Sequence, residues 1–336
     1  MKSFGLLLNG LDVDSRELMN DSGMRLTVTN FGATITSLKM PLKNGEFVDV
    51  VLGFDNLEAY IKSFDLPSAP YFGATVGRYA GRIKNGTFCL NEKTIHLNKN
   101  NNNHSLHGGN IGFSQKIWDV KEVTTGKNPS ITFSCISPAG EENYPGNLSV
   151  NLTYTLSEQN ELMVEYKVTT TEDTIINLTH HSYFNLDGHS GTIVEQLLTI
   201  DSDRVLEVDN ENIPTGNFLK LEDAGFDFRL SKKCPQNIDT TFVLNKSEVE
   251  KAALFSSKNN LKMTVFTNQP AVHIYVGGNC FNTIKGKENA DYHALSGICF
   301  ETQNFPDAPN HDHFPTAVLK KGDEYFHNTI YKFQSF

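Results

Sequence analysis

Apolar and polar residues alternate with a period of two over much of this chain. The clearest case lies at residues 148–168, where apolar side chains occupy every second position on either side of a polar turn at 157–161. Successive side chains of a strand point to opposite faces, so this pattern predicts a hairpin with one buried face. Long stripes with the 3.6-residue period of a helix are missing.

Similar runs predict further strands, at 47–52, 118–123, 131–136, 196–200, 262–266, 272–276, 298–302 and 325–333. Turn residues such as Asp187-Gly188 and Pro306-Asp307 separate them. One short helix is predicted from Asp55 as its N-cap, with Glu58 three residues later. Many short strands indicate packed antiparallel sheets. Because no linker or shift in composition divides the chain, we expect a single all-β domain over residues 1–336.

The stretch 176–186 has a polar face and an apolar face if it is extended. The polar face carries Asn177, Thr179, His181, Tyr183 and Asn185, whereas His180 falls among apolar residues. An apolar core does not tolerate unpaired hydrogen-bonding groups, so the polar row suits a polar ligand such as a sugar. Histidine exchanges protons near neutral pH, which makes His181 the candidate for chemistry. A half-exposed strand with a solvated side is the alternative.

Composition excludes several classes of partner. The formal net charge is -10, and lysine and arginine form no run, which argues against a nucleic-acid partner. No apolar stretch reaches the roughly 20 residues of a membrane helix. The apolar run near Met1 is too short for a secretory signal, so we expect a soluble, cytoplasmic protein. The 5 cysteines are far apart and form no C-x-x-C pair, which disfavours disulfides and zinc.

Two segments with glycines carry candidate ligand-binding residues. Arg78 and Arg82 lie in a segment that begins at Gly77, and arginine offers a fork of donors to carboxylates or sugar hydroxyls. The alternative for both is a surface salt bridge. His107 precedes Gly108-Gly109, where a ligand can approach the backbone closely.

Three further candidates lie on or next to predicted strands. Glu301 directly follows an apolar run and should be partly buried, which makes it a candidate acid or base or else a salt-bridged residue. His273 alternates with aliphatic residues, and a structural histidine is the simpler interpretation. Asp239 precedes an apolar strand and could equally be a turn residue. His311-Asp312-His313 lacks a suitably spaced carboxylate, so we interpret it as a surface loop and expect no metal site.

Five segments together resemble one known family. They are Gly77-Arg78-Tyr79-Ala80-Gly81-Arg82-Ile83, Ser105-Leu106-His107-Gly108-Gly109, His181-Ser182-Tyr183-Phe184-Asn185-Leu186, Ile213-Pro214-Thr215-Gly216 and Glu301-Thr302-Gln303-Asn304-Phe305-Pro306-Asp307. In order and spacing they are similar to the galactose mutarotase (aldose 1-epimerase) family, and the resemblance covers nearly the whole chain.

The resemblance implies a large antiparallel β-sandwich that interconverts the α and β anomers of galactose- and glucose-type aldoses without a cofactor. It places His181 at the position of the general acid and Glu301 at that of the general base. Arg82, His107 and Asp239 fall at sugar-binding positions, and His273 is a further expected substrate contact. We expect a small aldose as the ligand, no nucleic-acid or membrane partner, and a monomer or a homodimer.

The chain departs from the family pattern at three places. Relatives often have Asn at Gly81 and Gln at His273, and the usual Gly-Phe-Asp-His-Asn pattern around Asp239 is altered, with Thr240 and Thr241 after the aspartate. These departures leave the sugar preference open.

The sequence leaves four alternatives to an aldose 1-epimerase. A hexose-phosphate epimerase of the same fold would need an extra basic cluster for the phosphate, which the sequence lacks. A β-sandwich glycosidase would use Asp239 and Glu301 as its carboxylate pair. A cupin-like metal enzyme would use the histidines as ligands. A non-catalytic sugar-binding protein would have no need of paired His181 and Glu301.

Overall fold

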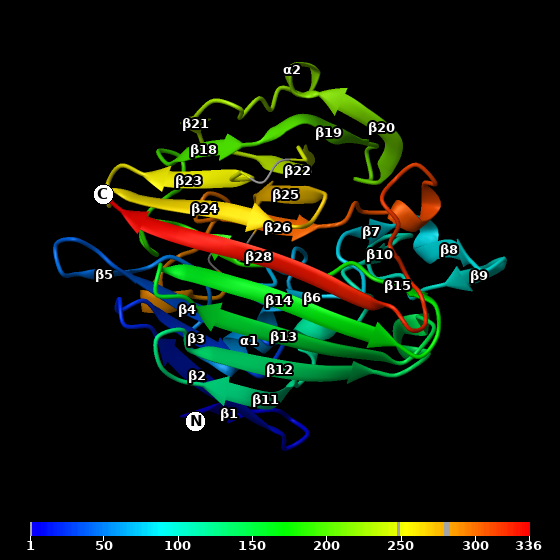
Figure 1. Ribbon diagram of the computed structural model, residues 1–336, viewed down its shortest axis with the longest axis horizontal. Coiled ribbons are helices and arrows are strands. Elements are labelled where there is room, and N and C mark those ends of the chain that lie inside the picture. Colours follow the sequence, from blue (N-terminus) through cyan, green and yellow to red (C-terminus); the bar gives the residue numbers. More distant parts are fainter. Residues whose placement is uncertain (1, 247–248, 279–282) are drawn as a thin grey trace.

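The computed structural model describes residues 2–246, 249–278 and 283–336, so Cys280 lies outside the described residues. Strands dominate this part of the chain (Figure 1). Its helical segments are short: α1 (Leu57–Ser63), α2 (Leu221–Ala224), η1 (Lys84–Gly86), η2 (Phe113–Gln115), η3 (Glu141–Asn143), η4 (Lys287–Asn289) and η5 (Ala308–Asn310). Among the described residues, no helix combines the length and apolarity required to cross a membrane.

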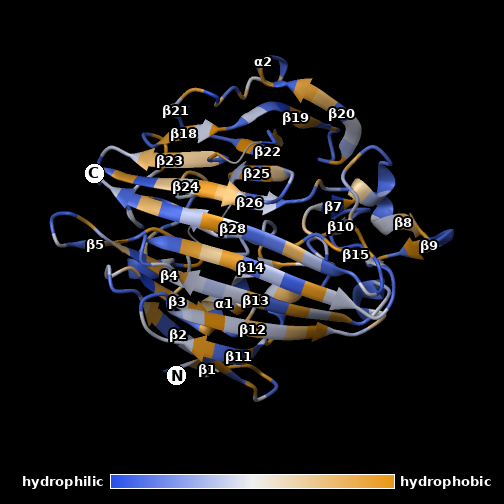
Figure 2. Cartoon of the chain, in the orientation of Figure 1, coloured by the Kyte–Doolittle hydropathy of each residue, from blue (hydrophilic) through white to orange (hydrophobic). Residues whose placement is uncertain are grey.

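The largest sheet in the described residues has 9 strands. In spatial order they are β11 (Asp119–Thr124), β12 (Ser130–Ser137), β13 (Leu148–Leu156), β14 (Glu161–Thr170), β28 (Glu324–Ser335), β24 (Leu261–Thr267), β23 (Ala252–Ser256), β18 (Leu197–Ile200) and β21 (Lys232–Lys233). The predicted hairpin is β13 paired with β14, from Leu148 opposite Thr170 to Leu156 opposite Leu162. Burial alternates from residue to residue along both β14 and β28. In β14 the buried positions are mostly hydrophobic (Figure 2), whereas in β28 they include His327 and Thr329.

A second sheet has 6 strands among the described residues and packs against the first. In spatial order they are β17 (Tyr183–Phe184), β26 (Ile298–Gln303), β25 (Ala271–Val276), β22 (Ile238–Leu244), β19 (Ser202–Val208) and β20 (Pro214–Lys220). Phe300 and Ile274 from this sheet share one core cluster with Val164 and Tyr331 from the larger sheet. The two sheets therefore form the predicted antiparallel β-sandwich. The opposite face of the smaller sheet points away from this core.

Shorter sheets complete the fold. The N-terminal sheet consists of β1 (Lys2–Leu6), β2 (Asp12–Met19), β3 (Arg25–Thr29), β4 (Ile35–Pro41) and β5 (Phe47–Asp49). Four strand pairs are β10 (Ser105–Leu106) with β7 (Arg82–Ile83), β15 (Thr174–Ile175) with β27 (Val318–Leu319), β16 (Thr179–His180) with β6 (Thr75–Val76), and β8 (Thr87–Leu90) with β9 (Lys93–His96).

Two local predictions need correction. Helix α1 begins one residue later than expected, because the side chain of Asn56, and not that of Asp55, caps it by accepting a hydrogen bond from the Ala59 amide at 2.9 Å. The stretch 176–186 is not one continuous strand, since β16 and β17 are separate 2-residue strands.

The polar row of this stretch serves mainly to join strands. The Asn177 side chain donates to the carbonyls of Ala80 and Asn304. The Thr179 hydroxyl donates to the Thr302 carbonyl, and the Asn185 amide donates to that of Ser296. The interpretation of the whole row as a ligand-binding face was therefore wrong at these three positions, whose side chains satisfy backbone groups in the interior.

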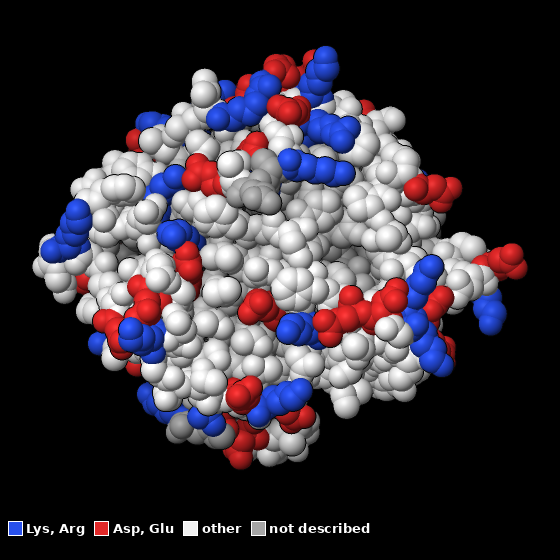
Figure 3. All heavy atoms as spheres, in the orientation of Figure 1, with Lys and Arg blue, Asp and Glu red and all other residues white. Residues whose placement is uncertain are grey.

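Charged side chains are interspersed on the face shown in Figure 3, where lysine and arginine lie among aspartate and glutamate. That face has no continuous basic surface, in agreement with the formal net charge of -10.

Candidate active site

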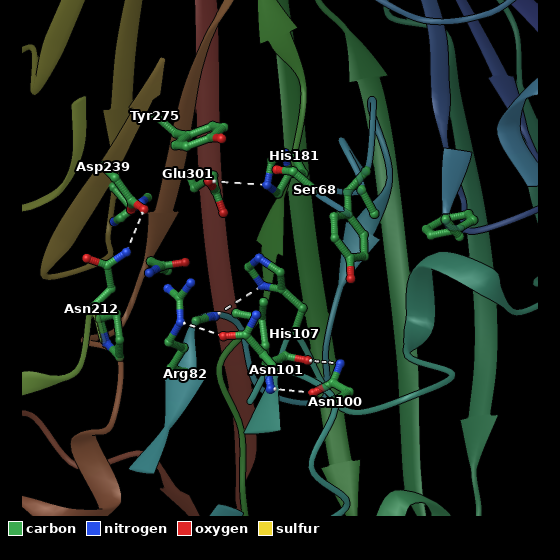
Figure 4. A pocket seen from close by; sticks show the side chains of 18 of the residues that line it. Ser68, Arg82, Asn100, Asn101, His107, His181, Asn212, Asp239, Tyr275 and Glu301 are labelled. Carbon is green, nitrogen blue, oxygen red and sulfur yellow. Dashed lines mark hydrogen bonds and ion pairs between the residues drawn. The ribbon is translucent and has the colours of Figure 1, made fainter. Parts of the chain in front are cut away.

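A cavity of about 440 Å³ opens on the face of the smaller sheet that lies away from the sandwich core. Its floor comes from β22, β25, β26 and β17, and its walls come from loops that include residues 64–71, 100–115 and 208–214. All six predicted site residues line it: Arg82, His107, His181, Asp239, His273 and Glu301. Figure 4 shows the labelled members of this set around one space.

The register of the sheet explains how distant residues meet here. In one row across the strands Glu301 pairs with His273, and His273 pairs with Thr241. The neighbouring row on the same face contains Tyr183, Cys299, Tyr275 and Asp239, each paired with the next. Because side chains two residues apart on a strand share a face, both rows point to the cavity side.

His181 faces Glu301 across the end of the first row, and Figure 4 shows the two side chains pointing toward each other. The His181 Nε2 atom lies 3.4 Å from the Glu301 Oε1 atom, and the two side chains are only 6% and 3% exposed. His180 has a different partner from His181, because its Nε2 atom contacts the Ser182 hydroxyl at 2.6 Å. Burial lowers the pKa of His180 to about 3. The alternation thus separated the core histidine from the cavity histidine correctly.

Cys299 lies beneath this pair, with its Sγ atom 3.6 Å from the His181 Nδ1 atom. Burial, reinforced by the charge of Glu301, raises the pKa of the Cys299 thiol well above its usual value. Ligand atoms of His181, Cys299 and Glu301 lie within 4.8 Å of one another, which is close enough for a metal ion. A cysteine binds a metal as its thiolate, so a metal here would have to displace the proton that burial favours on the Cys299 sulfur.

His107 presents a neutral imidazole to the cavity. Its backbone has a φ of 53°, and its Nδ1 atom accepts a hydrogen bond from the Gly81 amide at 3.2 Å. Burial, together with the positive charges around it, holds its pKa well below the usual value. With Nδ1 occupied as an acceptor, the ring proton lies on Nε2, which is a donor. The His107 ring also packs against those of Tyr71 and His181, at centroid distances of 5.1 and 5.7 Å.

The two arginines of the glycine-containing segment differ in role. Arg82 lines the cavity, and its Nε donates to the Asn101 side chain at 3.0 Å. Arg78 is 2% exposed and donates to four backbone carbonyls, of Ser137, Pro138, Pro145 and Gly146. Arg78 is therefore neither a surface salt bridge nor a cavity residue, and it holds the chain between β12 and β13 in place.

Asp239 and His273 form a pair on the opposite side of the cavity from His181. The His273 Nε2 atom lies 2.9 Å from the Asp239 Oδ1 atom. Burial alone would raise the pKa of Asp239, but the hydrogen bond and charge of His273 outweigh it and hold that pKa below its usual value. The Asn212 side chain donates to the other carboxylate oxygen at 3.2 Å (Figure 4).

Some cavity residues were not among the sequence predictions: Tyr71, Asn101, Asn212 and Tyr275. Asn212 directly precedes the segment Ile213-Pro214-Thr215-Gly216, and that position was its only sequence signal. In the motif His311-Asp312-His313, His313 is exposed and its Nε2 atom contacts the Gly216 carbonyl at 2.8 Å. This agrees with the surface-loop interpretation.

Comparison with known proteins gives a consistent result. A family model described as aldose 1-epimerase matches residues 14–332. Galactose mutarotase from Bos taurus is 40% identical over 332 residues, which cover 96% of this chain and 94% of that protein. Aldose 1-epimerase from Haemophilus influenzae is 36% identical, with 94% of each chain covered. The crystal structure of an aldose epimerase homologue from C. elegans has a TM-score of 0.88 and 33% identity, and the match covers 96% of this chain and 99% of that one.

Proposed function

The chain belongs to the aldose 1-epimerase family, and on that premise we propose that it interconverts the α and β anomers of galactose- and glucose-type aldoses. The observation that carries the proposal is the approach of His181 to Glu301 in a cavity large enough for a sugar.

The proposed chemistry requires an acid and a base at one carbon atom. In a cyclic aldose the anomeric hydroxyl oxygen and the ring oxygen are both bonded to C1. Glu301 as a carboxylate removes the proton of the anomeric hydroxyl, while His181 as an imidazolium protonates the ring oxygen, and the C1–O bond of the ring breaks. Groups that serve two oxygens of one carbon must be neighbours, and a separation of 3.4 Å meets that requirement.

Ring closure then reverses the two transfers. The open-chain aldehyde turns about its C1–C2 bond, so the hydroxyl of the former ring can attack the opposite face of the carbonyl. His181 takes back the proton of that hydroxyl as the bond to C1 forms, and the proton on Glu301 returns to the new anomeric oxygen. Both residues recover their initial state, and the reaction needs no redox partner.

The remaining cavity residues are suited to holding the sugar while C1 moves. The neutral His107 ring and the Arg82 guanidinium offer donors to sugar oxygens, and the Asp239 carboxylate offers acceptor sites to sugar hydroxyls. A mixture of fixed donors and acceptors recognises a neutral polyhydroxylated ring. We propose that Arg82, His107 and Asp239 have this binding role.

Polarimetry tests the proposal directly. Freshly dissolved α-galactose and α-glucose should approach their equilibrium rotation faster with the wild-type protein than without it. Glu301→Gln should reduce the rate constant by at least about two orders of magnitude, because the amide cannot accept the proton. Glu122→Gln, an exposed change on β11, is the matched control and should retain wild-type activity. A wild-type protein that leaves the rotation rate unchanged would refute the proposal.

Three expectations from the sequence stay predictions: a cytoplasmic location, a single domain over residues 1–336, and a monomer or homodimer as the assembled state. The absence of a cofactor is likewise a prediction, which the same assay tests when it is repeated after dialysis against a chelator.

A further inference from the structure

Both ring nitrogens of His273 are occupied by protein groups. The Nε2 atom lies 2.9 Å from the Asp239 carboxylate, and the Nδ1 atom lies 2.8 Å from the Thr241 hydroxyl. An imidazole ring has only these two hydrogen-bonding atoms. Although His273 lines the cavity, it therefore has no ring donor or acceptor left for a sugar hydroxyl.

The sheet builds this arrangement directly. Thr241 on β22 pairs with His273 on β25, so the hydroxyl lies beside the ring. Asp239 lies two residues before Thr241 on the same face, which places its carboxylate diagonally across from His273. Asn212 donates to the second carboxylate oxygen at 3.2 Å. Each oxygen of Asp239 thus has one donor from the protein, and a carboxylate has further lone pairs for ligand hydroxyls.

Charges on the neighbouring elements favour a protonated His273. Asp239 on β22 and Glu301 on β26 are negative neighbours, whereas Arg82 on β7 is positive, and the nearby His107 ring is neutral. Burial works against the charged ring, but the hydrogen bond and charge of Asp239 outweigh it, so the pKa of His273 lies above its usual value. The imidazolium–carboxylate bond is accordingly charge-assisted, which makes it stronger than a neutral one.

We propose that His273 is a positioning residue, which acts on the sugar only through Asp239 by fixing the carboxylate against the sugar hydroxyls. This inference rests on the proposed function of the cavity, and it replaces the expectation that His273 itself contacts the substrate. Thr241 completes the unit because its hydroxyl fixes the far side of the imidazole ring.

The arrangement has a defined pH dependence. As the pH rises through the raised pKa of His273, the ring loses one proton. The Thr241 hydroxyl can then turn to donate to Nδ1, so the Nε2–H bond to Asp239 survives without its positive charge. Asp239 is held less firmly in this state, which weakens sugar binding. We therefore expect KM to rise with pH as His273 loses its proton. The same loss should change kcat little.

A double-mutant cycle separates action through Asp239 from direct contact. The four proteins are wild type, His273→Leu, Asp239→Asn and the double variant, and polarimetry with galactose gives kcat and KM for each. His273→Leu should raise KM by roughly tenfold and leave kcat within about threefold. In the Asp239→Asn background the same change should have a much smaller further effect, because the carboxylate charge that His273 holds in place is gone and only a neutral acceptor is left. Fully additive effects would overturn the proposal.

His273→Gln is the conservative variant. Its side-chain amide can donate to Asp239 but does not titrate. Its KM should lie close to that of the wild type and well below that of His273→Leu, and it should lack the rise with pH that the wild type shows. A His273→Gln variant with the same KM as His273→Leu, or with an unchanged pH profile, would contradict the proposed role.

Histidine NMR of the free protein provides a readout that is independent of activity. In the wild type the pKa of the His273 ring should lie above that of free histidine, and in Asp239→Asn this pKa should fall. This measurement remains valid if a His273 variant fails to fold. If the wild type does not catalyse mutarotation, the proposed function fails while the NMR result still reports on the pair. If the wild type is active but His273 titrates like free histidine, only the positioning proposal fails.

Discussion

The His181 Nε2 atom lies 3.4 Å from the Glu301 Oε1 atom because β17 pairs with β26. Tyr183 lies opposite Cys299 in that antiparallel pair. His181 lies two residues before Tyr183, just outside β17, and Glu301 lies two residues after Cys299 on β26. Because β26 is held in register by β25 as well, a shift of one residue between β17 and β26 would turn Tyr183 away from the cavity face, and His181 with it. The register of a 2-residue strand therefore decides whether His181 and Glu301 can meet.

Replacement of His181 by asparagine tests its role as the acid. His181→Asn removes the proposed proton donor to the ring oxygen, so kcat for mutarotation should fall by at least about two orders of magnitude. KM should change much less, because most of the proposed sugar contacts come from other residues. The measurement is polarimetry with α-galactose over a range of concentrations.

The same variant distinguishes two enzyme classes. A glycosidase that used Asp239 and Glu301 would keep much of its activity in His181→Asn, and it would release nitrophenol from a nitrophenyl galactoside. We expect no such release from either protein. Retention of more than about a tenth of wild-type mutarotation by His181→Asn would show that another residue supplies the proton.

His107 should act as a neutral donor at all working pH values. Its pKa is held well below the usual value by burial and by nearby positive charges, so it stays uncharged as the pH rises from about 5.5 to 8.5. His107→Phe keeps a ring but removes the Nε2 donor, and it should raise KM about tenfold. The ratio of variant to wild-type KM should be constant across this pH range. A ratio that falls toward high pH would indicate a charged His107 instead.

The sequence predicted what depends on local pattern. The strand that carries Glu301 was predicted from its apolar run, and it is buried on both faces. Alternation located the hairpin at 148–168, since one buried face is enough to impose a period of two. It also separated His180 from His181. Both results follow from the two-sided geometry of a strand, which can be recognised from the order of residues in a short segment.

The partner of a polar side chain could not be predicted in the same way. Asn177 and His181 fall on the same face of the predicted strand. Asn177 nevertheless donates to the carbonyls of Ala80 and Asn304, which come from distant segments. Arg78 and Arg82 lie in one motif, but Arg78 reaches carbonyls at 137–146 while Arg82 reaches the cavity. Whether such a group meets a ligand or a backbone carbonyl is fixed by tertiary contacts, about which local pattern carries no information.

A buried ion pair away from the cavity should govern stability in acid. The Lys287 Nζ atom lies 2.9 Å from the Asp49 Oδ2 atom and also donates to the Thr36 carbonyl at 2.6 Å. Burial would raise the pKa of Asp49, but Lys287 and His189 outweigh it and hold that pKa well below the usual range. A carboxylate with a lowered folded-state pKa stabilises the protein above its unfolded pKa, near 3.9, and this contribution is lost as the pH falls below that value.

Replacement of Lys287 should show how much this ion pair contributes to stability. Lys287→Met leaves the Asp49 charge buried without its main counter-charge, so the free energy of unfolding should fall by about 3–5 kcal/mol at neutral pH. Urea unfolding followed by circular dichroism measures it. The double variant Asp49→Asn, Lys287→Met should recover part of the loss and show a weaker decline in stability below about pH 4 than the wild type. Equal declines in acid would show that other carboxylates dominate.

Arg78 should be needed for stability and not for sugar recognition. It is 2% exposed, and its guanidinium satisfies the carbonyls of Ser137, Pro138, Pro145 and Gly146. Arg78→Lys keeps the charge but cannot reproduce the planar fork of donors, and its three N–H groups leave at least one of the four carbonyls without a partner. Since each buried unsatisfied group costs about 1–3 kcal/mol, the free energy of unfolding should fall by at least that amount.

Arg82→Lys is the matched comparison, because it makes the same chemical change at the cavity. It should raise KM for galactose and leave the unfolding free energy within about 1 kcal/mol of the wild type, since Arg82 is only partly buried. Arg78→Lys should show the opposite pattern when assayed well below its unfolding temperature, with normal KM and lower stability. If Arg78→Lys raised KM as much as Arg82→Lys does, the division of roles between the two arginines would be wrong, and the motif would act on the sugar as a unit.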